Sequence, residues 1–211
     1  MAIPAHKPPY YRHILPLRHH PGLARRVGIM GGSFNPAHNG HIEISLSARK
    51  TAQLDEVWWL VSPQNPLKQS DGMASFSERI SYARTLALPP WIRISDFEIT
   101  QPSCRTIDTL TRLKQIFRCS QLIWIMGADN LIELPRWQAP RQIMRMIDVM
   151  VMGRPGFNYH ALAGKGAAIA GRQRRRRSAR LLGRGNTGWY FHHHTRNSLS
   201  ATAIRTQTGR S

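Results

Sequence analysis

The sequence predicts an α/β fold in which helices cover a doubly wound parallel sheet. Short apolar runs of strand length alternate with segments of helical periodicity, and a glycine-rich turn follows the first apolar run and opens the first helical segment. Strands that alternate with helices form βαβ units, whose strands are parallel. The chain has 211 residues, of which 41% are hydrophobic, so it can bury a substantial core, and its length favours one domain.

The elements follow one another in a regular order. Buried strands are expected at residues 26–30, 56–61, 91–94, 121–126 and 148–152. Helices are expected between them, at residues 40–52, 76–86, 106–117 and 140–146. Ser75 and Glu78 have the spacing of a capping box for the second of these helices. The pattern weakens after Gly153, and a last strand at residues 189–193 and a short helix from Ser200 are expected there.

The chain carries a formal net charge of +19 at pH 7. Much of this charge lies in a basic tail rich in Pro, His and Arg at residues 1–24 and in an Arg-rich insert near residues 172–184. Charge runs of this kind are typical of solvated segments, so we expect one domain over residues 25–211 that carries the insert. Contacts between these arginines and the phosphates of a nucleic acid are the alternative.

Targeting signals and cysteines narrow the cellular location that we expect for the protein. The sequence has no apolar run long enough to span a membrane and no signal-peptide pattern at its start. Cys104 and Cys119 are too few for a disulfide framework and are not spaced as metal ligands. We therefore expect a cytoplasmic protein without membrane contact, as a monomer or homo-oligomer.

The stretch from Gly31 to His41 is the most informative part of the sequence. Glycines let backbone N–H groups approach a ligand closely, and the unpaired N–H groups at a helix start attract phosphate oxygens. His38 and His41 are three residues apart at this helix start, so both rings can face one point and donate hydrogen bonds to a triphosphate. The residues expected to cradle a nucleotide in this turn are Gly31, Gly32, Ser33, Phe34 and Asn35.

Other interpretations of this stretch fit less well. A metal pair would need a further Glu or Cys nearby, and none completes such a set, so no protein metal ligand is predicted. The spacing also differs from Gly-x4-Gly-Lys-Ser/Thr and from Gly-x-Gly-x-x-Gly, which disfavours kinase-like hydrolysis and hydride transfer. The arrangement resembles the signature of the nucleotidyltransferase superfamily, whose members share a Rossmann-like fold and join a nucleotide monophosphate from ATP or CTP to a phosphate.

Later segments are similar to those of the bacterial nicotinate-nucleotide adenylyltransferase family, and they occur in the family order. They are Pro-Gln-Asn-Pro-Leu-Lys at 63–68, Ser-Cys-Arg-Thr-Ile-Asp-Thr-Leu at 103–110, Gly-Ala-Asp at 127–129, Leu-Pro-Arg-Trp at 134–137, Arg-Pro-Gly at 154–156 and Ser-Ala-Thr-Ala-Ile-Arg at 200–205. Each is short, and their shared order carries the resemblance. Arg105 departs from the family pattern, because it stands where tyrosine is usual.

The resemblance implies a role for each matching residue. The groups that stabilise the transferred phosphate are then His38, His41, Lys68 and Arg205. The further groups that hold ATP are Asp129, Arg154, Ser200 and Thr202. The groups that hold the second substrate are Asn65, Arg105, Thr106 and Trp137. Within that set, Trp137 would stack on the pyridine ring while Thr106 and its neighbouring backbone meet the nicotinate carboxylate.

The reaction implied by the resemblance is transfer of AMP from ATP, with Mg²⁺, to nicotinate mononucleotide, which gives deamido-NAD and pyrophosphate. The 5′-phosphate of the mononucleotide would attack the α-phosphorus of ATP in line, and this phosphate is already ionised, so no general base is assigned. One alternative is another transferase of the same fold, acting on nicotinamide mononucleotide or pantetheine phosphate. The other is a basic nucleic-acid-binding protein.

Overall fold

The computed structural model describes residues 25–63, 73–101, 103–171, 174, 178–182 and 187–193. Its strands are β1 (Arg26–Gly32), β2 (Glu56–Val61), β3 (Ile92–Ser95), β4 (Gln121–Gly127), β5 (Asp148–Met152) and β6 (Trp189–His192). Its α-helices are α1 (Asn39–Ala52), α2 (Phe76–Thr85), α3 (Thr106–Ile116), α4 (Ala128–Glu133), α5 (Pro140–Met146), α6 (Asn158–Ala163) and α7 (Lys165–Ala170). Three 3₁₀ helices complete the described part, η1 (Phe97–Thr100), η2 (Leu134–Arg136) and η3 (Ala179–Leu181).

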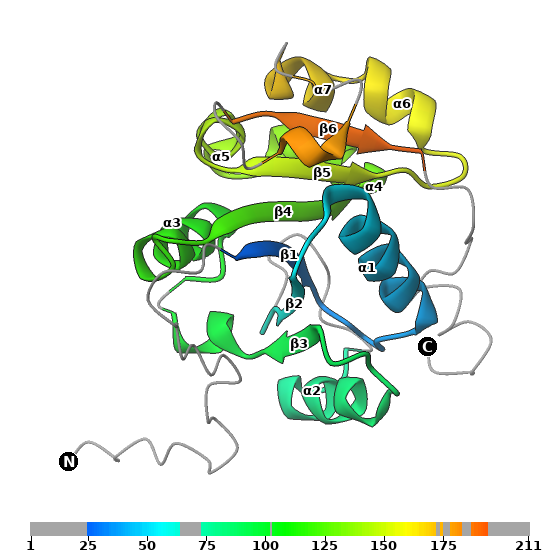
Figure 1. Cartoon of the computed structure of the whole chain (residues 1–211), viewed down its shortest axis with the longest axis vertical. Helices are drawn as coiled ribbons and strands as arrows, with labels where there is room; N and C mark the ends of the chain where they lie inside the picture. Colours follow the sequence, from blue (N-terminus) through cyan, green and yellow to red (C-terminus); the bar gives the residue numbers. More distant parts are fainter. Residues whose placement is uncertain are drawn as a thin grey trace.

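In the described residues these strands form one sheet in the order β3-β2-β1-β4-β5-β6, and every neighbouring pair is parallel (Figure 1). The predicted doubly wound, Rossmann-like sheet is therefore confirmed. The chain winds from β1 out to β3, returns to the other side of β1 as β4, and winds out again to β6. The winding direction reverses between β1 and β4, and open α/β sheets bind ligands beyond the carboxyl ends of the strands at such a switch point.

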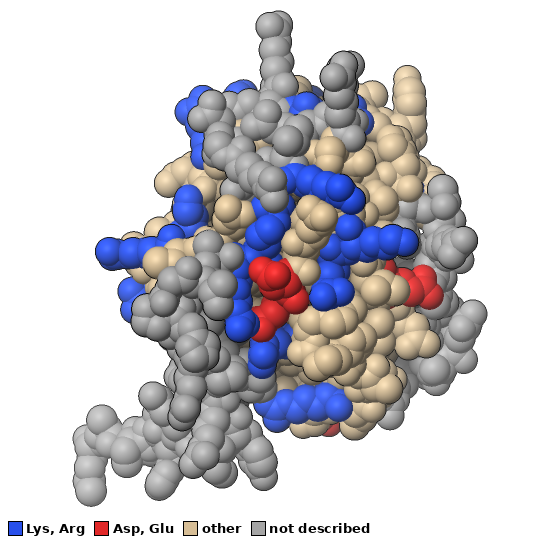
Figure 2. All heavy atoms as spheres, in the orientation of Figure 1, with Lys and Arg blue, Asp and Glu red and all other residues tan. Residues whose placement is uncertain are grey.

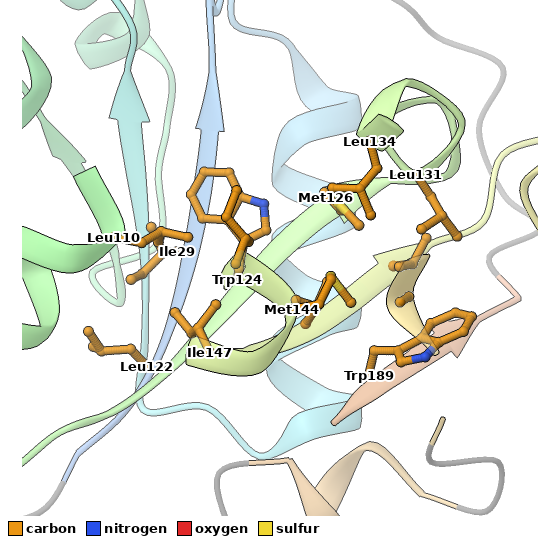
Figure 3. Packing of buried hydrophobic residues seen from close by; sticks show 14 of the residues in the cluster. Ile29, Leu110, Leu122, Trp124, Met126, Leu131, Leu134, Met144, Ile147 and Trp189 are labelled. Carbon is orange, nitrogen blue, oxygen red and sulfur yellow. The ribbon is translucent and has the colours of Figure 1, made fainter. Parts of the chain in front are cut away.

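Helices cover both faces of the sheet, and each face has its own apolar core. Neighbouring residues of a strand point to opposite faces, so Trp58 belongs to one core and Trp59 to the other. The Trp58 core contains Trp124 of β4 together with Leu131 of α4 and Met144 of α5 (Figure 3). The Trp59 core is closed by residues of α1, α2 and η3. Strands buried on both faces explain why the apolar runs in the sequence are nearly continuous.

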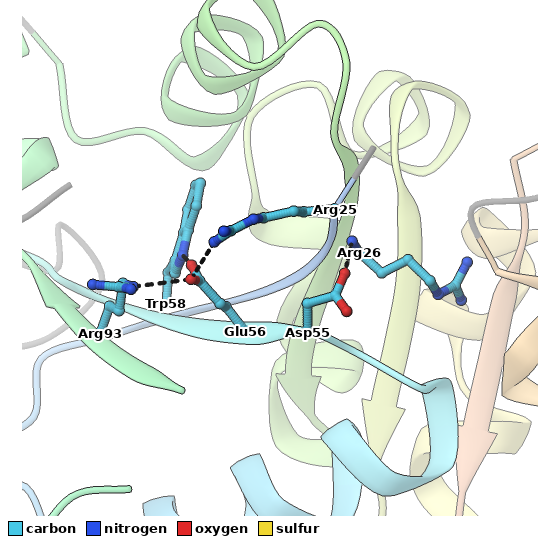
Figure 4. A network of polar contacts seen from close by, with 6 residues as sticks. All are labelled: Arg25, Arg26, Asp55, Glu56, Trp58 and Arg93. Atoms are coloured by element: carbon cyan, nitrogen blue, oxygen red, sulfur yellow. Dashed lines mark hydrogen bonds and ion pairs between the residues drawn. The ribbon is translucent and has the colours of Figure 1, made fainter. Parts of the chain in front are cut away.

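Ion pairs tie together the amino ends of β1, β2 and β3 (Figure 4). One carboxylate oxygen of the buried Glu56 accepts a hydrogen bond from Nη1 of Arg25 at 2.6 Å and lies 3.1 Å from Nε of Arg93. Its other oxygen accepts a hydrogen bond from Nε1 of Trp58 at 2.9 Å. The backbone N–H of Arg26 donates to Asp55 at 2.7 Å. This network fixes the edge of the sheet that lies opposite the carboxyl ends of the strands.

The described elements agree closely with those predicted from the sequence. β2, α5 and β5 have the predicted bounds, and the capping box is confirmed, because Oγ of Ser75 accepts from the N–H of Glu78 while Oε2 of Glu78 accepts from the N–H of Ser75. β1 runs further than predicted, because Gly31 and Gly32 continue the strand and pair with β2. The predicted tail at residues 1–24 and the predicted helix from Ser200 lie outside the described residues.

Short helices and one arginine of the insert differ from prediction. α4, α6 and α7 were not predicted, since six residues are too few to show helical periodicity. Arg174 bridges Trp189 through its backbone, and its guanidinium lies over the rings of Trp189 and Phe191 at 5.3 and 5.9 Å. The expected solvated run is therefore wrong at Arg174, because aromatic faces of β6 offer this cation a packing site.

Elsewhere, Lys and Arg side chains spread over the visible face among few Asp and Glu (Figure 2).

Candidate functional site

A cavity of about 500 Å³ lies beyond the carboxyl ends of β1, β4 and β5, at the switch point of the sheet. Its lining comes from elements that pack on opposite faces of the sheet, with α1 on the face of Trp59 and η1 and α3 on the face of Trp58, and these form two walls. Residues from the start of α1 and the segment after β5 line one side, and they include His38, His41 and Arg154. Residues from η1, the start of α3 and the segment after α4 line the other side, and they include Glu98, Thr106 and Trp137. The ends of β1 and β4 form the floor between them.

Close packing at the floor explains the first glycine of the predicted turn. A Cβ atom on Gly31 would overlap the ring of Trp124, so a larger residue would displace this buried side chain. Gly32 has more room, because the nearest atom to a Cβ there would be in Phe34 at 3.4 Å. Phe34 adopts a positive φ of 47° and stacks on Trp59, with 5.1 Å between the ring centroids. The turn thus passes from the strand into the start of α1 over a packed aromatic floor.

Asn35 has a structural contact and does not line the cavity. It is buried, and its Oδ1 accepts a hydrogen bond from the backbone N–H of Ala74 at 3.2 Å. This bond ties the turn to the segment that precedes α2. Asn35 therefore supports the turn from behind, whereas Gly31 and Ser33 line the cavity.

His38 and His41 form a capping box at the start of α1. Nδ1 of His38 accepts a hydrogen bond from the N–H of Gly40 at 3.1 Å, and Nδ1 of His41 accepts from the N–H of His38 at 3.2 Å. An imidazole that accepts through Nδ1 carries its proton on Nε2 when neutral. Both rings line the cavity, and their centroids lie 3.9 Å apart. The capping box therefore leaves two Nε2–H donors for a ligand.

Both imidazoles are neutral at physiological pH. Burial, followed by the positive charge of Arg154, lowers the pKa of His38 from 6.5 to about 4. Burial, followed by repulsion from His38 were it protonated and from the charge of Arg154, lowers the pKa of His41 to about 3. Two neutral N–H donors at a helix start can hydrogen-bond to an anion without adding positive charge. The dipole of α1 and the charge of Arg154 already attract that anion.

Buried polar atoms without partners mark where a polar ligand is expected. Within the described part of the chain, Nε2 of His38, Nε1 of Trp124 and Oδ1 of Asp129 are buried and have no hydrogen-bond partner. All three residues line the cavity. Native proteins rarely leave such groups unpaired, since burying one without a partner costs about 1–3 kcal/mol. A ligand with both donors and acceptors would satisfy them.

Arg154 and Asp129 form an ion pair at the cavity, with 3.3 Å between Nη1 and Oδ2. The backbone N–H of Arg154 donates to Oδ1 of Asn158 at 2.7 Å, which fixes the segment after β5. Both side chains are partly exposed, so this ion pair contributes little to stability. The pair therefore presents one positive and one negative group to the cavity.

The second wall contains residues that the sequence pattern did not single out. Glu98 is buried, and its Oε1 accepts a hydrogen bond from Oγ1 of Thr109 at 3.1 Å. Burial raises the pKa of Glu98 to about 7, although hydrogen bonds from Thr109 and Ser62 act in the opposite direction. Ser62 and Trp124 also line the cavity and were not predicted. Their places depend on contacts between distant segments, and no local motif marks them.

Most predicted site residues of the described chain lie together in this cavity. They are Gly31, Gly32, Ser33, Phe34, His38, His41, Arg105, Thr106, Asp129, Trp137 and Arg154. Thr106 begins α3, whose N-cap Arg105 makes no side-chain capping bond. Trp137 is partly buried against the Trp58 core. The remaining predicted residues, Asn65, Lys68, Ser200, Thr202 and Arg205, lie outside the described residues.

Two larger features are absent from the described residues. No three His, Cys, Asp or Glu side chains gather into a metal site anywhere in the described ranges. None of the helices that the structure describes is long and apolar enough to cross a membrane.

Comparison with known proteins adds independent findings. A family model described as cytidylyltransferase-like matches residues 29–207. A protein from Gluconobacter oxydans named "Probable nicotinate-nucleotide adenylyltransferase" is 41% identical to this chain, covering 85% of the chain and 93% of that protein. A protein of the same name from Methylorubrum extorquens is also 41% identical, covering 86% of the chain and 100% of that protein.

A solved structure shows the same fold at low sequence identity. The nicotinic acid mononucleotide adenylyltransferase of Plasmodium falciparum, complexed with NaAD, matches with a TM-score of 0.67 and 14% identity. The match covers 86% of this chain and 83% of the Plasmodium chain.

Proposed function

The chain belongs to the nicotinate-nucleotide adenylyltransferases, within the cytidylyltransferase-like family, and we propose that its cavity at the switch point is where AMP is transferred from ATP to nicotinate mononucleotide. The products are deamido-NAD and pyrophosphate. The pair of Nε2–H donors of His38 and His41 at the start of α1 is the main support for placing the reaction in this cavity. The buried Nε2 of His38 has no partner among the described residues, as expected for a donor that waits for phosphate.

The phosphates occupy the α1 wall in this proposal. An oxygen of the mononucleotide's 5′-phosphate forms a bond to the α-phosphorus of ATP, and the bond from that phosphorus to the bridging oxygen of the β-phosphate breaks, so pyrophosphate leaves with the electron pair. His38 and His41 donate hydrogen bonds to the oxygens on which charge develops, and the N-terminus of α1 adds its dipole. Arg154 leaves Asp129 and neutralises further phosphate charge.

Mg²⁺ enters as part of the substrate MgATP. It shields the triphosphate and makes the α-phosphorus easier to attack. The carboxylate of Asp129 can contact the coordination shell of this Mg²⁺ or a ribose hydroxyl, because its Oδ1 is buried without a partner in the described residues. The protein's own contribution is to position two substrates and stabilise charge, and no covalent intermediate with the protein is needed.

The mononucleotide's ring lies against the second wall. Trp137 offers an aromatic face for stacking on the pyridine, and the backbone N–H groups at the start of α3, beside Thr106, face the carboxylate. Arg105 stands at the N-cap of the same helix and supplies a positive charge near that anion. The roles predicted from sequence are kept for five residues on segments outside the described residues, namely Lys68, Asn65, Ser200, Thr202 and Arg205.

The compartment forms part of the same proposal. Cys104 and Cys119 are both free thiols, which supports a reducing compartment such as the cytoplasm.

Analysis of products tests the proposed function. Purified protein is incubated with MgATP and nicotinate mononucleotide, and products are separated by liquid chromatography and weighed by mass spectrometry. Deamido-NAD and pyrophosphate should form in equal amounts, and omission of the mononucleotide should abolish pyrophosphate release. ATP hydrolysis that continues without the mononucleotide, or the absence of any dinucleotide, would refute the assignment.

A further inference from the structure

We propose that Glu98 distinguishes the acid mononucleotide from its amide: the neutral carboxyl donates a hydrogen bond to the nicotinate carboxylate, whereas the ionised form repels it. This inference rests on the proposed function, because it concerns the ring that the same cavity holds.

The position of Glu98 brings it to the ring wall of the cavity. Glu98 belongs to η1, which follows β3, and it lines the cavity with Thr106 of α3 and Trp137 after η2. The phosphate-binding groups proposed above, His38 and Arg154, come from α1 and from the segment after β5. A side chain in the η1 and α3 wall therefore meets the ring and its substituent, the part in which the acid and the amide differ.

Hydrogen bonds hold the carboxyl of Glu98 in one orientation. Oγ1 of Thr109, a fully buried residue of α3, donates to its Oε1 at 3.1 Å, and the side chain of Ser62 after β2 also bonds to it. Only 5% of Glu98 is exposed. No ion pair to Glu98 occurs in the described part of the chain. A buried carboxyl that is held by hydroxyl groups, without a cation, has little to stabilise its charged form.

The ionisation of Glu98 is therefore placed near neutrality. Burial raises its pKa to about 7, and the Thr109 and Ser62 hydroxyls limit that rise. The other titratable or charged groups that line the same cavity are His38 and His41 from α1, Cys104 and Arg105 before α3, Asp129 and Glu133 from α4, Arg136 from η2 and Arg154 after β5. Asp96 precedes Glu98 at the N-cap of η1.

The two protonation states favour different ring substituents. A protonated carboxyl is a hydrogen-bond donor, which suits the carboxylate of the acid mononucleotide. An ionised carboxyl only accepts hydrogen bonds, so it repels that carboxylate but accepts from the N–H₂ of a carboxamide. Preference for the acid should therefore fall as pH rises through the ionisation of Glu98.

The ratio of two specificity constants tests this inference. The kcat/KM values for nicotinate mononucleotide and for nicotinamide mononucleotide are measured with MgATP from pH 6 to pH 8.5. Ionisation of ATP, of the 5′-phosphate or of the histidines affects both substrates and cancels in the ratio. The acid-to-amide ratio of the wild type should fall by roughly tenfold, as a one-proton transition with its midpoint near 7.

Variants separate Glu98 from other ionising groups. Glu98→Gln keeps the shape and the acceptor oxygen but does not titrate, so its ratio should be independent of pH. Thr109→Val removes a donor that stabilises the ionised form, so its midpoint should move to higher pH. Glu133→Gln, which changes another carboxyl of the same cavity, should keep the wild-type profile.

The outcomes distinguish this inference from the proposed function. A wild-type ratio that does not change with pH, or an unchanged slope in Glu98→Gln, would overturn the role of Glu98 while leaving the adenylyl transfer intact. Absence of deamido-NAD at every pH would overturn the proposed function itself. If Glu98→Gln does not fold, the wild-type profile and the direction of the Thr109→Val shift still decide the matter.

Discussion

Nδ1 of His41 accepts a hydrogen bond from the backbone N–H of His38 at 3.2 Å. This bond, with the matching bond from the N–H of Gly40 to His38, uses the inner nitrogen of each ring to begin α1 and leaves the outer nitrogen as a donor. The same two residues therefore cap a helix and face the cavity.

The stability of the protein should fall in mild acid because His38 and His41 are held neutral. Their pKa values are lowered from 6.5 to about 4 and about 3, so below pH 6.5 the unfolded chain binds protons that the folded chain does not. Each ring should then cost up to about 1.4 kcal/mol of unfolding free energy per pH unit as pH falls towards 4. Urea unfolding at several pH values between 5 and 8 measures this slope.

Asparagine variants identify the source of the acid sensitivity. The double variant His38→Asn and His41→Asn should lose less stability than the wild type between pH 7 and pH 5. His160→Asn, at an exposed position on α6, should behave as the wild type. Equal slopes in all three proteins would show that other groups cause the acid sensitivity.

Arg79 should be required for the arrangement of two loops beside the cavity. Its guanidinium is almost fully buried and donates to the carbonyls of Ser33 at 2.5 Å and Ser62 at 2.7 Å, and also to those of Ala74 and Pro63. Arg79→Ala would leave these carbonyls without a donor and should lower the unfolding free energy by about 3 kcal/mol. Arg84→Ala, at an exposed position of the same helix, should have little effect. Similar melting temperatures for the two variants would contradict this role.

Two adjacent glycines should respond differently to alanine. A Cβ on Gly31 would overlap the ring of Trp124, whereas one on Gly32 would approach Phe34 no closer than 3.4 Å, an ordinary contact. Gly31→Ala should therefore cost about 1–3 kcal/mol of stability, as overpacking in a core does, and Gly32→Ala should cost less. Thermal unfolding of both variants measures the difference. A larger loss for Gly32→Ala would show that the floor of the cavity is packed differently.

Cys104 provides a native reporter of the cavity because it is a free cysteine among the lining residues. In a Cys119→Ser background, nicotinate mononucleotide at ten times its dissociation constant should slow alkylation of Cys104 about tenfold, since about nine tenths of the sites are occupied. Mass spectrometry of the labelled peptide follows the rate. Alkylation at the same speed with and without the mononucleotide would place the ring elsewhere.

The cavity wall that contains His38 and His41 could be predicted because its signal is local. A strand, a glycine-rich turn and two histidines at a helix start lie within a short stretch of sequence, and parallel strands bring their carboxyl ends to one edge. Trp137 and Arg154 were reached through motif resemblance, and the structure places both on the walls of the same cavity. Asn35 shows a limit of motif matching. Its place in the motif predicts a contact with the nucleotide, but its side chain accepts a hydrogen bond from the backbone of Ala74 behind the turn.

The role suggested for Glu98 could not be predicted from the sequence. Its environment is made by Thr109 of α3 and Ser62 after β2, which meet only when the sheet is assembled. The low pKa values of the histidines similarly depend on burial and on Arg154, which is more than a hundred residues away along the chain. Desolvation and long-range charge are properties of the packed cavity, so no spacing in the sequence encodes them visibly.

The most direct test of the proposed active site compares two variants of His41 by their turnover. In His41→Asn the amide oxygen can replace Nδ1 as the cap acceptor, but no donor remains at the position of Nε2. In His41→Gln the amide N–H₂ can take the place of Nε2–H while the cap is weakened.

The measured quantity is kcat for deamido-NAD formation, with circular dichroism as the check that both variants are folded. His41→Asn should fold normally and lose roughly a hundredfold or more in kcat, as expected when one donor to the developing charge is removed, and His41→Gln should retain more activity. Near-normal turnover in His41→Asn, with a larger loss in His41→Gln, would show that His41 only caps the helix and would contradict the proposed role of this cavity wall.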